Sequence, residues 1–349
     1  MNAPEPRPGL RDVEPYQAPQ LDVPVRLNTN ECPFPLPDGF MDDLIEQVRR
    51  IPLNRYPDRE ALRLRKLLAE MSNIPVEGVW AANGSNEVIS QLLLAYGGPG
   101  RRVALFEPTY ALHSRLAWLA YSETVEIAVE PPFVITSELA GQALSAEPNV
   151  VFVCSPNNPT GNAQPPEIVE ELARSNALVI VDEAYIEFGG KSATGLLQSH
   201  PNVAVVRTFS KAFALAGARL GYCLASPEIV DDLRRVRLPY HLSSLTQAAG
   251  LVALKHAEDA LAILDAVRRE RDRILEALGR MKGVVAYPSD ANFVLFRPPG
   301  EAKAVWNALL EKGVLVRDVS DIVEGCLRVT AGTTPEVDRF LSAFQEVLP

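Results

Sequence analysis

Residues 177–185 read ALVIVDEAY, and this stretch decides the fold class. Its first five residues form a short apolar run, which is typical of a strand buried on both faces. Six further apolar runs occupy residues 78–82, 103–106, 124–129, 149–154, 203–207 and 219–225. Helical stretches are predicted between them at 86–96, 110–121, 166–175 and 227–236. This alternation predicts an α/β fold with a mostly parallel seven-stranded sheet covered by helices.

The chain changes character on both sides of this region. Residues 1–37 are rich in Pro, Asn and Asp and predict an extended arm, and after Pro239 two helical stretches are expected at 243–256 and 258–281. Shorter strands and helices follow and predict a smaller α+β domain. The expected segments are an N-terminal arm with part of the small domain (1–45), a large domain (46–245), and a small C-terminal α+β domain (246–349) joined by a long interdomain helix.

The composition excludes several classes of protein. The chain has 349 residues, of which 47% are hydrophobic and 22% charged, so it is globular rather than disordered or collagen-like. Its net charge of −10 disfavours nucleic acid as a partner. The four cysteines and four histidines are scattered without ligand spacing, so no metal is expected. With no apolar stretch long enough for a membrane and no leader segment recognised, we expect a cytoplasmic protein.

Polar residues follow several of the predicted strands, at the edge where open α/β sheets bind ligands. Residues 84–86 open a helix whose free N–H groups can hold an anion, although a plain helix cap explains them as well. Asn158 lies in the turn SPNNPTG, which is stiff enough to aim an amide; a structural turn is an equal alternative. Asp182 ends a buried strand, where a carboxylate is costly unless a cation pairs with it.

Lys211 follows the next predicted strand within the sequence TFSKAF. Apolar neighbours favour a lysine with a lowered pKa and a nucleophilic amine, whereas a surface lysine is the alternative. The hydroxyls of Thr208 and Ser210 and the guanidinium of Arg219 can hold a phosphate. An amine, a buried carboxylate, an aimed amide and a phosphate cradle at one sheet edge together match what pyridoxal phosphate requires.

Three motifs, NPTG at 158–161, DEAY at 182–185 and TFSK at 208–211 with Arg219 beyond it, resemble those of the fold-type I pyridoxal-phosphate aminotransferases. The resemblance covers nearly the whole chain. It implies that Lys211 is the Schiff-base lysine and that Asp182 faces the pyridine nitrogen. It also implies further cofactor contacts: Asn158 and Tyr185 to the ring oxygen, Tyr110 stacked on the ring, and Ser85, Asn86, Thr208, Ser210 and Arg219 to the phosphate.

The arm and the tail resemble the branch of this family that acts on histidinol phosphate. The matching segments are PYQAP at 15–19, LNTNECP at 27–33, RYPD at 55–58, VRD at 316–318 and LRVT at 327–330. The resemblance implies these substrate contacts: Tyr16 and Asn30 from the arm, Arg328 to the α-carboxylate and Arg317 to the phosphate end. It also implies that Tyr56 reaches the cofactor phosphate of a neighbouring subunit, and therefore a homodimer.

Two positions depart from the pattern of this family, and a third matches it without an assigned role. Cys32 replaces the usual Asn, Asn86 stands where many relatives have Asp, and Asn292 matches the family without a role that the sequence assigns.

The implied activity is transamination of L-histidinol phosphate with 2-oxoglutarate, giving imidazole-acetol phosphate and glutamate in histidine biosynthesis. An aromatic amino-acid aminotransferase on the same scaffold is the main alternative, because fold and cofactor do not distinguish the two. A phosphothreonine-type decarboxylase is another. A cofactor-binding regulator would need a DNA-binding domain, for which this acidic chain has no room.

Overall fold

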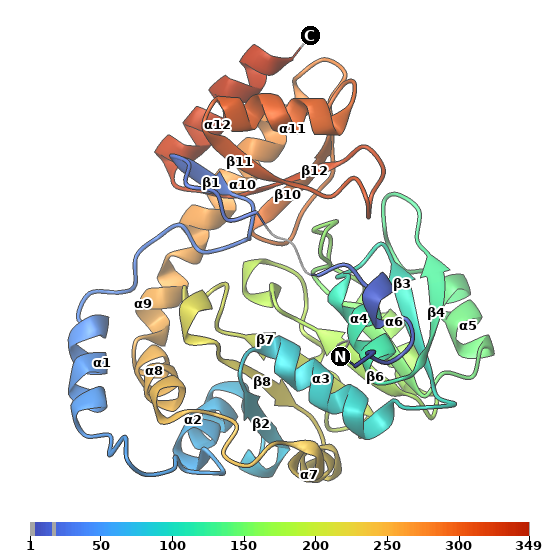
Figure 1. The fold of residues 1–349 in the computed structure, drawn as a ribbon, viewed down its shortest axis with the longest axis vertical. Helices are drawn as coiled ribbons and strands as arrows, with labels where there is room; N and C mark the ends of the chain where they lie inside the picture. Colours follow the sequence, from blue (N-terminus) through green and yellow to red (C-terminus); the bar gives the residue numbers. More distant parts are fainter. Residues whose placement is uncertain (1–3, 16–18, 349) are drawn as a thin grey trace.

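The computed structural model describes residues 4–15 and 19–348. Two sheets organise the chain (Figure 1). The larger has seven strands in the order β2-β8-β7-β6-β5-β3-β4. Its strands are β2 (Val79–Ala82), β3 (Arg102–Glu107), β4 (Glu123–Ala128), β5 (Val150–Cys154), β6 (Leu178–Asp182), β7 (Val203–Thr208) and β8 (Gly221–Leu224). Strand β8 runs antiparallel to both of its neighbours, β2 and β7, and the other four pairs of neighbouring strands are parallel. The predicted mostly parallel seven-stranded sheet is confirmed.

Helices cover both faces of this sheet. Successive side chains of a strand point to opposite faces, so each central strand contributes to two apolar clusters. On β6, Val179 and Val181 belong to one apolar cluster, and Leu178 and Ile180 belong to another. The first cluster includes residues of α2 (Leu62–Ser72), α5 (Ser137–Ser145) and α6 (Pro166–Ala173). The second includes residues of α3 (Ser85–Tyr96), α4 (Leu112–Leu119) and α7 (Pro227–Val236). This double cover explains why the central strands are continuous apolar runs.

The second sheet has five strands in the order β1-β11-β12-β10-β9. Its strands are β1 (Val25–Leu27), β9 (Val285–Ala286), β10 (Phe293–Arg297), β11 (Val314–Asp318) and β12 (Leu327–Thr330). The predicted extended arm therefore supplies one strand, which pairs in parallel with β11. Helices α11 (Ala302–Glu311) and α12 (Thr334–Val347) lie above this sheet in Figure 1.

A helical run links the two sheets and differs in part from the prediction. It consists of α8 (Ser244–Lys255), α9 (Ala257–Ala262) and α10 (Leu264–Gly279). The single helix expected over 258–281 was wrong, since Ile263 separates α9 from α10. Helix α5 was not expected, although Thr136 caps it by accepting the N–H of Leu139.

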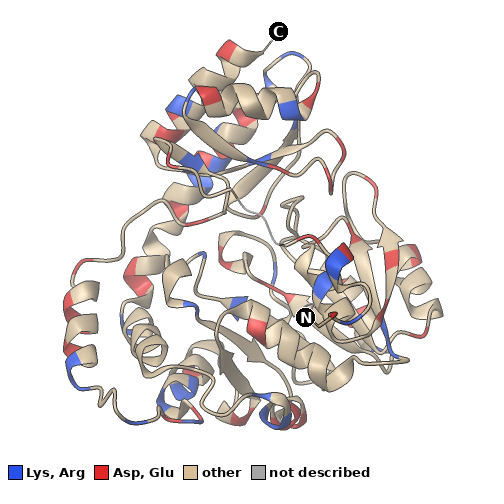
Figure 2. Cartoon of the chain, in the orientation of Figure 1, with Lys and Arg blue, Asp and Glu red and all other residues tan. Residues whose placement is uncertain are grey.

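Helix α1 (Phe40–Arg49) packs against α8 and leads from the arm into the larger part of the chain (Figure 1). We propose domain bounds at 1–45, 46–245 and 246–349, because these divide the strands of the two sheets cleanly. Charges of both signs are spread over the outer helices (Figure 2). Among the helices of residues 4–15 and 19–348, none combines the length and apolar character needed to cross a membrane.

Candidate active site

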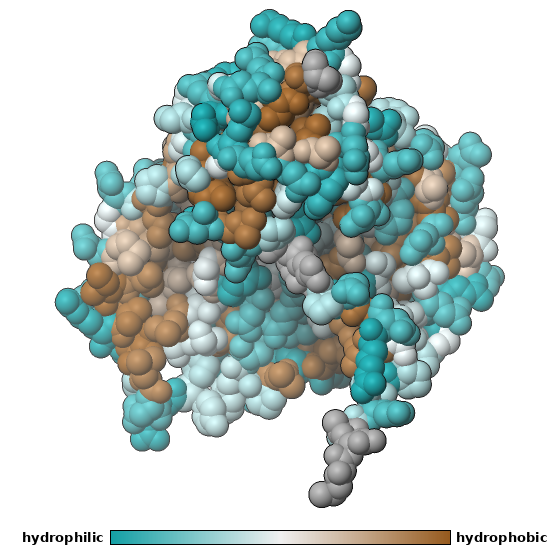
Figure 3. Space-filling model, turned by 45° about the horizontal axis from the view of Figure 1, so that its top comes forward, coloured by the Kyte–Doolittle hydropathy of each residue, from teal (hydrophilic) through white to brown (hydrophobic). Residues whose placement is uncertain are grey.

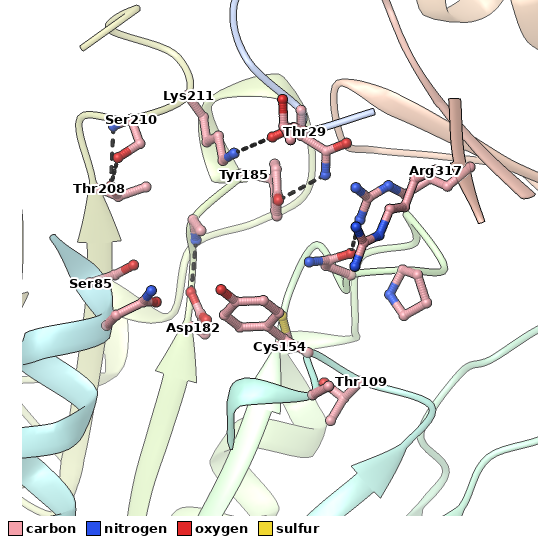
Figure 4. A pocket seen from close by; sticks show the side chains of 18 of the residues that line it. Thr29, Ser85, Thr109, Cys154, Asp182, Tyr185, Thr208, Ser210, Lys211 and Arg317 are labelled. Carbon is pink, nitrogen blue, oxygen red and sulfur yellow. Dashed lines mark hydrogen bonds between the residues drawn. The ribbon is translucent and has the colours of Figure 1, made fainter. Parts of the chain in front are cut away.

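A cavity lies between the carboxyl edge of the large sheet and the small sheet (Figure 4). Its volume is about 1050 Å³, including the part open to solvent. The large sheet supplies residues that follow five of its strands, the arm supplies Asn28, Thr29 and Asn30, and the small sheet supplies Arg317 and Arg328. The cavity therefore forms at the strand ends where the sequence placed the site.

Lys211 extends into this cavity from the segment after β7. Its Nζ donates a hydrogen bond to the backbone oxygen of Thr29 at 2.9 Å, and lies 5.8 Å from the ring centre of Tyr185 (Figure 4). Burial, together with the positive charges of Arg328 and Arg219, lowers the pKa of Lys211 to about 7. A lysine with this pKa holds a large share of neutral, nucleophilic amine at neutral pH.

Asp182 ends β6 and is 3% exposed. One carboxylate oxygen accepts the backbone N–H of Ala184 at 3.1 Å, and the other lies 3.0 Å from Nε2 of His113. His113 is fully buried and stacks on Phe152 with ring centres 4.6 Å apart. The ring of His113 thus holds Asp182 in one orientation, with its carboxylate facing the cavity.

An anion cradle lies where β8 begins beside the start of α3. Arg219 donates to Oγ of Ser210 at 3.2 Å, and Thr208 donates to the same Oγ at 2.9 Å. A side chain at Gly221 would place its Cβ 2.3 Å from the backbone nitrogen of Ser85, and one at Gly84 would meet Arg219 at 2.7 Å. These two glycines let the guanidinium and the free N–H groups of a 12-residue helix approach one another.

Asn158 is held by both sheets. Arg328 donates a short hydrogen bond from Nη1 to Oδ1 of Asn158, and a second from Nη2 to the backbone oxygen of Asn28 at 2.9 Å. Asp290, which precedes β10, donates its N–H to the oxygen of Gly161 at 2.7 Å, and its carboxylate accepts the N–H of Ala163 at 2.8 Å. The stiff turn expected around Asn158 is therefore fixed from the small-sheet side.

The arm makes the remaining contacts. The side chain of Asn30 donates from Nδ2 to Oη of Tyr185 at 2.9 Å. Both residues are buried, and burial raises the pKa of Tyr185 above its ordinary value. Consecutive residues 28, 29 and 30 thus contact Arg328, Lys211 and Tyr185 in turn.

Most of the residues expected from the sequence line this one cavity. They are Asn30, Ser85, Asn86, Tyr110, Asn158, Asp182, Tyr185, Thr208, Ser210, Lys211, Arg219, Arg317 and Arg328. Tyr56 is not among the lining residues: it is 80% exposed and stacks on Tyr240, with ring centres 4.4 Å apart. Tyr16 lies outside the described residues.

Two features of the site were missed. His113 lies three residues after Tyr110, and this spacing puts both residues on one side of a helical turn. The spacing could therefore have indicated that His113 lies near the site. The carbonyl of Thr29, which accepts from Lys211, gave no signal, because any residue type presents a backbone oxygen.

The donor set fits pyridoxal phosphate. The cradle of Ser210, Arg219 and the α3 N-terminus presents hydrogen-bond donors and positive charge to a phosphate. Lys211 presents an amine for the aldehyde, and Asp182 presents a carboxylate for a protonated ring nitrogen.

Comparison with known proteins agrees with this geometry. The family described as aminotransferase class I and II matches residues 23–344. A histidinol-phosphate aminotransferase of Frankia casuarinae is 48% identical, over 98% of this chain and 90% of that protein. One from Mycobacterium marinum is 46% identical, over 98% of this chain and 94% of its own.

A solved structure has the same fold. The histidinol-phosphate aminotransferase of Sinorhizobium meliloti, in complex with pyridoxal-5'-phosphate, superposes with a TM-score of 0.84 at 24% identity, covering 93% of this chain and 91% of that one. From the extent of the family match and the identity of its relatives, the chain belongs to the class I and II aminotransferases.

Proposed function

We propose that the protein is a pyridoxal-phosphate-dependent aminotransferase that converts L-histidinol phosphate and 2-oxoglutarate into imidazole-acetol phosphate and glutamate, a step of histidine biosynthesis. The observation that carries this proposal is the single cavity that joins Lys211, Asp182 and the anion cradle to two further arginines, Arg317 and Arg328. The names of relatives 45–48% identical over nearly the whole chain support the substrate.

The cofactor would be held by residues at the strand ends. The cradle of Ser85, Asn86, Thr208, Ser210 and Arg219 would bind its phosphate, Tyr110 would stack on its ring, and Asn158 and Tyr185 would bond its ring oxygen. When bound, pyridoxal phosphate supplies a ring that withdraws electrons and stabilises negative charge on the substrate carbon next to the amine. Asp182, oriented by His113, would keep a proton on the ring nitrogen and so maintain that electron withdrawal.

Lys211 would both hold the cofactor and move the proton. With the substrate amine in its place, Nζ of Lys211 would be free to take the proton from the substrate α-carbon and to deliver it to the former aldehyde carbon of the cofactor, on the other side of the nitrogen. Its pKa of about 7 suits both roles near neutral pH, because both protonation states are then well populated.

Two arginines would allow one site to accept two different anions. Arg328 presents a planar fork that is already buried beside Asn158 and the arm, which suits a carboxylate. Arg317 lies on the neighbouring strand β11 and would receive either the substrate phosphate or the distal carboxylate of 2-oxoglutarate. The arm residues Tyr16 and Asn30 would complete this side of the site.

We also propose a homodimer in which Tyr56 completes the site of the other subunit. Large apolar side chains are exposed near Tyr56: Leu53 is 71% and Leu238 is 72% exposed. Hydrophobic side chains also gather where α1 lies, on the left of Figure 3. An exposed apolar surface of this kind is typical of a subunit interface.

Subunit mixing tests this arrangement. If Tyr56 serves the other subunit, mixing inactive Lys211→Ala with weakened Tyr56→Ala subunits should restore one complete site per hybrid dimer. Activity no higher than that of the two parents, or a monomer by light scattering, would contradict the arrangement.

A cytoplasmic location completes the proposal. Cys32, Cys154, Cys223 and Cys326 are all free thiols, as expected for a reducing compartment. Cell fractionation would test this location.

The decisive assay measures glutamate formed by the purified protein from histidinol phosphate and 2-oxoglutarate. We expect turnover, and we expect Lys211→Ala to abolish both turnover and the absorbance that arises from the covalent link between the cofactor and Lys211. Faster turnover of phenylalanine than of histidinol phosphate would favour the aromatic alternative. Release of carbon dioxide without 2-oxoglutarate would favour the decarboxylase.

A further inference from the structure

Asn30 stands at the centre of a buried hydrogen-bond network. Its backbone N–H donates to Oγ1 of Thr330 at 3.1 Å, and the Thr330 hydroxyl donates to Oδ1 of Asn30 at 3.1 Å. The backbone oxygen of Asn30 accepts from Nδ2 of Asn292, again at 3.1 Å. The exposed fractions of these residues are 1%, 3% and 0%, respectively, so water does not compete for these bonds.

The network fixes which way the Asn30 amide points. Because the Thr330 hydroxyl receives the backbone N–H of Asn30, its own hydrogen is free to go to Oδ1. The amide oxygen is then engaged by Thr330, and the NH₂ end must face Tyr185, where it donates to Oη. An amide in the opposite orientation would leave the Thr330 hydrogen without Oδ1 as its acceptor.

This orientation in turn decides what Tyr185 can do. A phenol has one hydrogen to donate and lone pairs to accept with. Since Oη of Tyr185 already accepts from Asn30, its hydrogen is available to a different acceptor, and Tyr185 lines the cavity.

We propose that Asn30 and Thr330 are positioning residues, which present the Tyr185 hydroxyl as a hydrogen-bond donor to the ring oxygen of the cofactor. The inference rests on the proposed function for the cofactor itself. It gives Asn30 a role beyond the substrate contact implied by its motif, and it gives Asn292 the role of holding the arm in place.

The same network polarises the donor. An N–H bond donated to a phenol oxygen makes the phenol a stronger donor in its own right. The charged and titratable groups that face Tyr185 are Lys211, Arg328, Tyr110 and Cys154. None of these side chains is changed by substitutions at Asn30 or Thr330, so a change in the donor strength of Tyr185 can be read separately.

The test measures the absorbance of the cofactor-loaded protein between about pH 5 and 10, which gives the pH midpoint at which the bound cofactor loses its proton. A bond donated to the ring oxygen stabilises its ionised form and lowers that midpoint. Thr330→Val keeps the side-chain shape and removes the hydroxyl, so it should raise the midpoint by about half a pH unit, the scale of one lost hydrogen bond. The matched Thr330→Ser keeps the hydroxyl and should stay close to wild type.

Asn30→Asp gives a second, independent measurement. A carboxylate can only accept, so it would draw the Tyr185 hydrogen away from the cofactor and raise the midpoint nearly as far as Tyr185→Phe does. When Thr330→Val is combined with Tyr185→Phe, the extra shift should vanish, because the network acts through that hydroxyl. For Asn30→Asp, the shift measured in the Tyr185→Phe background is the direct effect of the added carboxylate, so only the excess over it is assigned to the hydroxyl.

The possible outcomes distinguish the positioning role of Asn30 and Thr330 from the proposed function of the protein. Shifts that persist unchanged in the Tyr185→Phe background, or the absence of any shift in Thr330→Val and Asn30→Asp, would overturn the positioning role alone. A wild-type protein that acquires no pH-dependent cofactor absorbance would overturn the proposed function, and the inference with it.

Discussion

The acidity of Lys211 offers the most direct physical test of the site. Its ordinary pKa of 10.5 is lowered to about 7, first by burial and then by the charge of Arg328. At pH 7 this makes about half of the Lys211 amines neutral, against roughly 0.0003 for an unperturbed lysine. We therefore expect Lys211 in the cofactor-free protein to react with a small acylating reagent on the order of a thousandfold faster than a surface lysine at that pH.

Acylation at each pH, quantified by mass spectrometry of the peptide that contains Lys211, gives the midpoint directly. Substituting Arg328 separates the two causes of the shift. Arg328→Gln removes the positive charge and should raise the midpoint by on the order of half a unit, while burial maintains most of the shift. The control Arg328→Lys retains a positive charge and should stay nearer to the wild-type value. A wild-type midpoint above about 9 would show that the cavity does not lower the pKa of Lys211 as expected.

The same shift makes stability depend on pH. Between about pH 7 and 10.5 Lys211 is neutral in the folded chain and charged in the unfolded chain, so unfolding binds a proton. The free energy of unfolding should therefore rise with pH across this interval, relative to that of Lys211→Met. The full shift corresponds to at most about 5 kcal/mol, and water in the cavity reduces the effect. Parallel curves of unfolding free energy against pH for the two proteins, measured by urea titration, would show that the pKa of Lys211 is not lowered in the folded chain.

Three further perturbations test other parts of the site. Gly221→Ala would place a Cβ 2.3 Å from the turn before α3 and should weaken cofactor binding about tenfold or more by fluorescence titration, whereas Gly217→Ala, with open space around its Cβ, should not. His113→Phe keeps a stacked ring but loses the contact with Asp182, so kcat should fall about tenfold with cofactor still bound; an unchanged kcat would remove His113 from the mechanism. Deleting residues 1–24 should raise the KM for histidinol phosphate clearly, while the melting temperature should fall only slightly. Equal KM values for the truncated and the full-length protein would show that the arm does not contribute to substrate binding.

The residues at the strand ends could be predicted because a parallel sheet brings the carboxyl ends of its strands to one edge. Asp182 ends β6 and Lys211 follows the adjacent strand β7, so both lie at this edge whatever the helices between the strands do. A buried apolar run that ends in a carboxylate is visible in the sequence. For these positions, identifying the strands was enough to bring the residues together.

Other elements depended on contacts that the local sequence does not encode. The break between α9 and α10 falls at Ile263, without a Pro or Gly to mark it. His113 shows its role only once α4 packs its ring on Phe152 beside Asp182. Its type and spacing are those of any buried histidine until the neighbouring strands are in place.

The arm shows most clearly why part of the site could not be predicted. Residues 28–30 have no periodic pattern, yet their bonds reach Arg328, Lys211 and Tyr185, which lie 300, 182 and 155 positions further along the chain. Two of these bonds use backbone oxygens, so the identity of the arm residue carries no information about them. What fixes the arm is the parallel pairing of β1 with β11, which sets residues 28–30 at the mouth of the cavity. The large sheet therefore determines which groups can do the chemistry, and a three-residue strand of the small sheet determines how they are oriented.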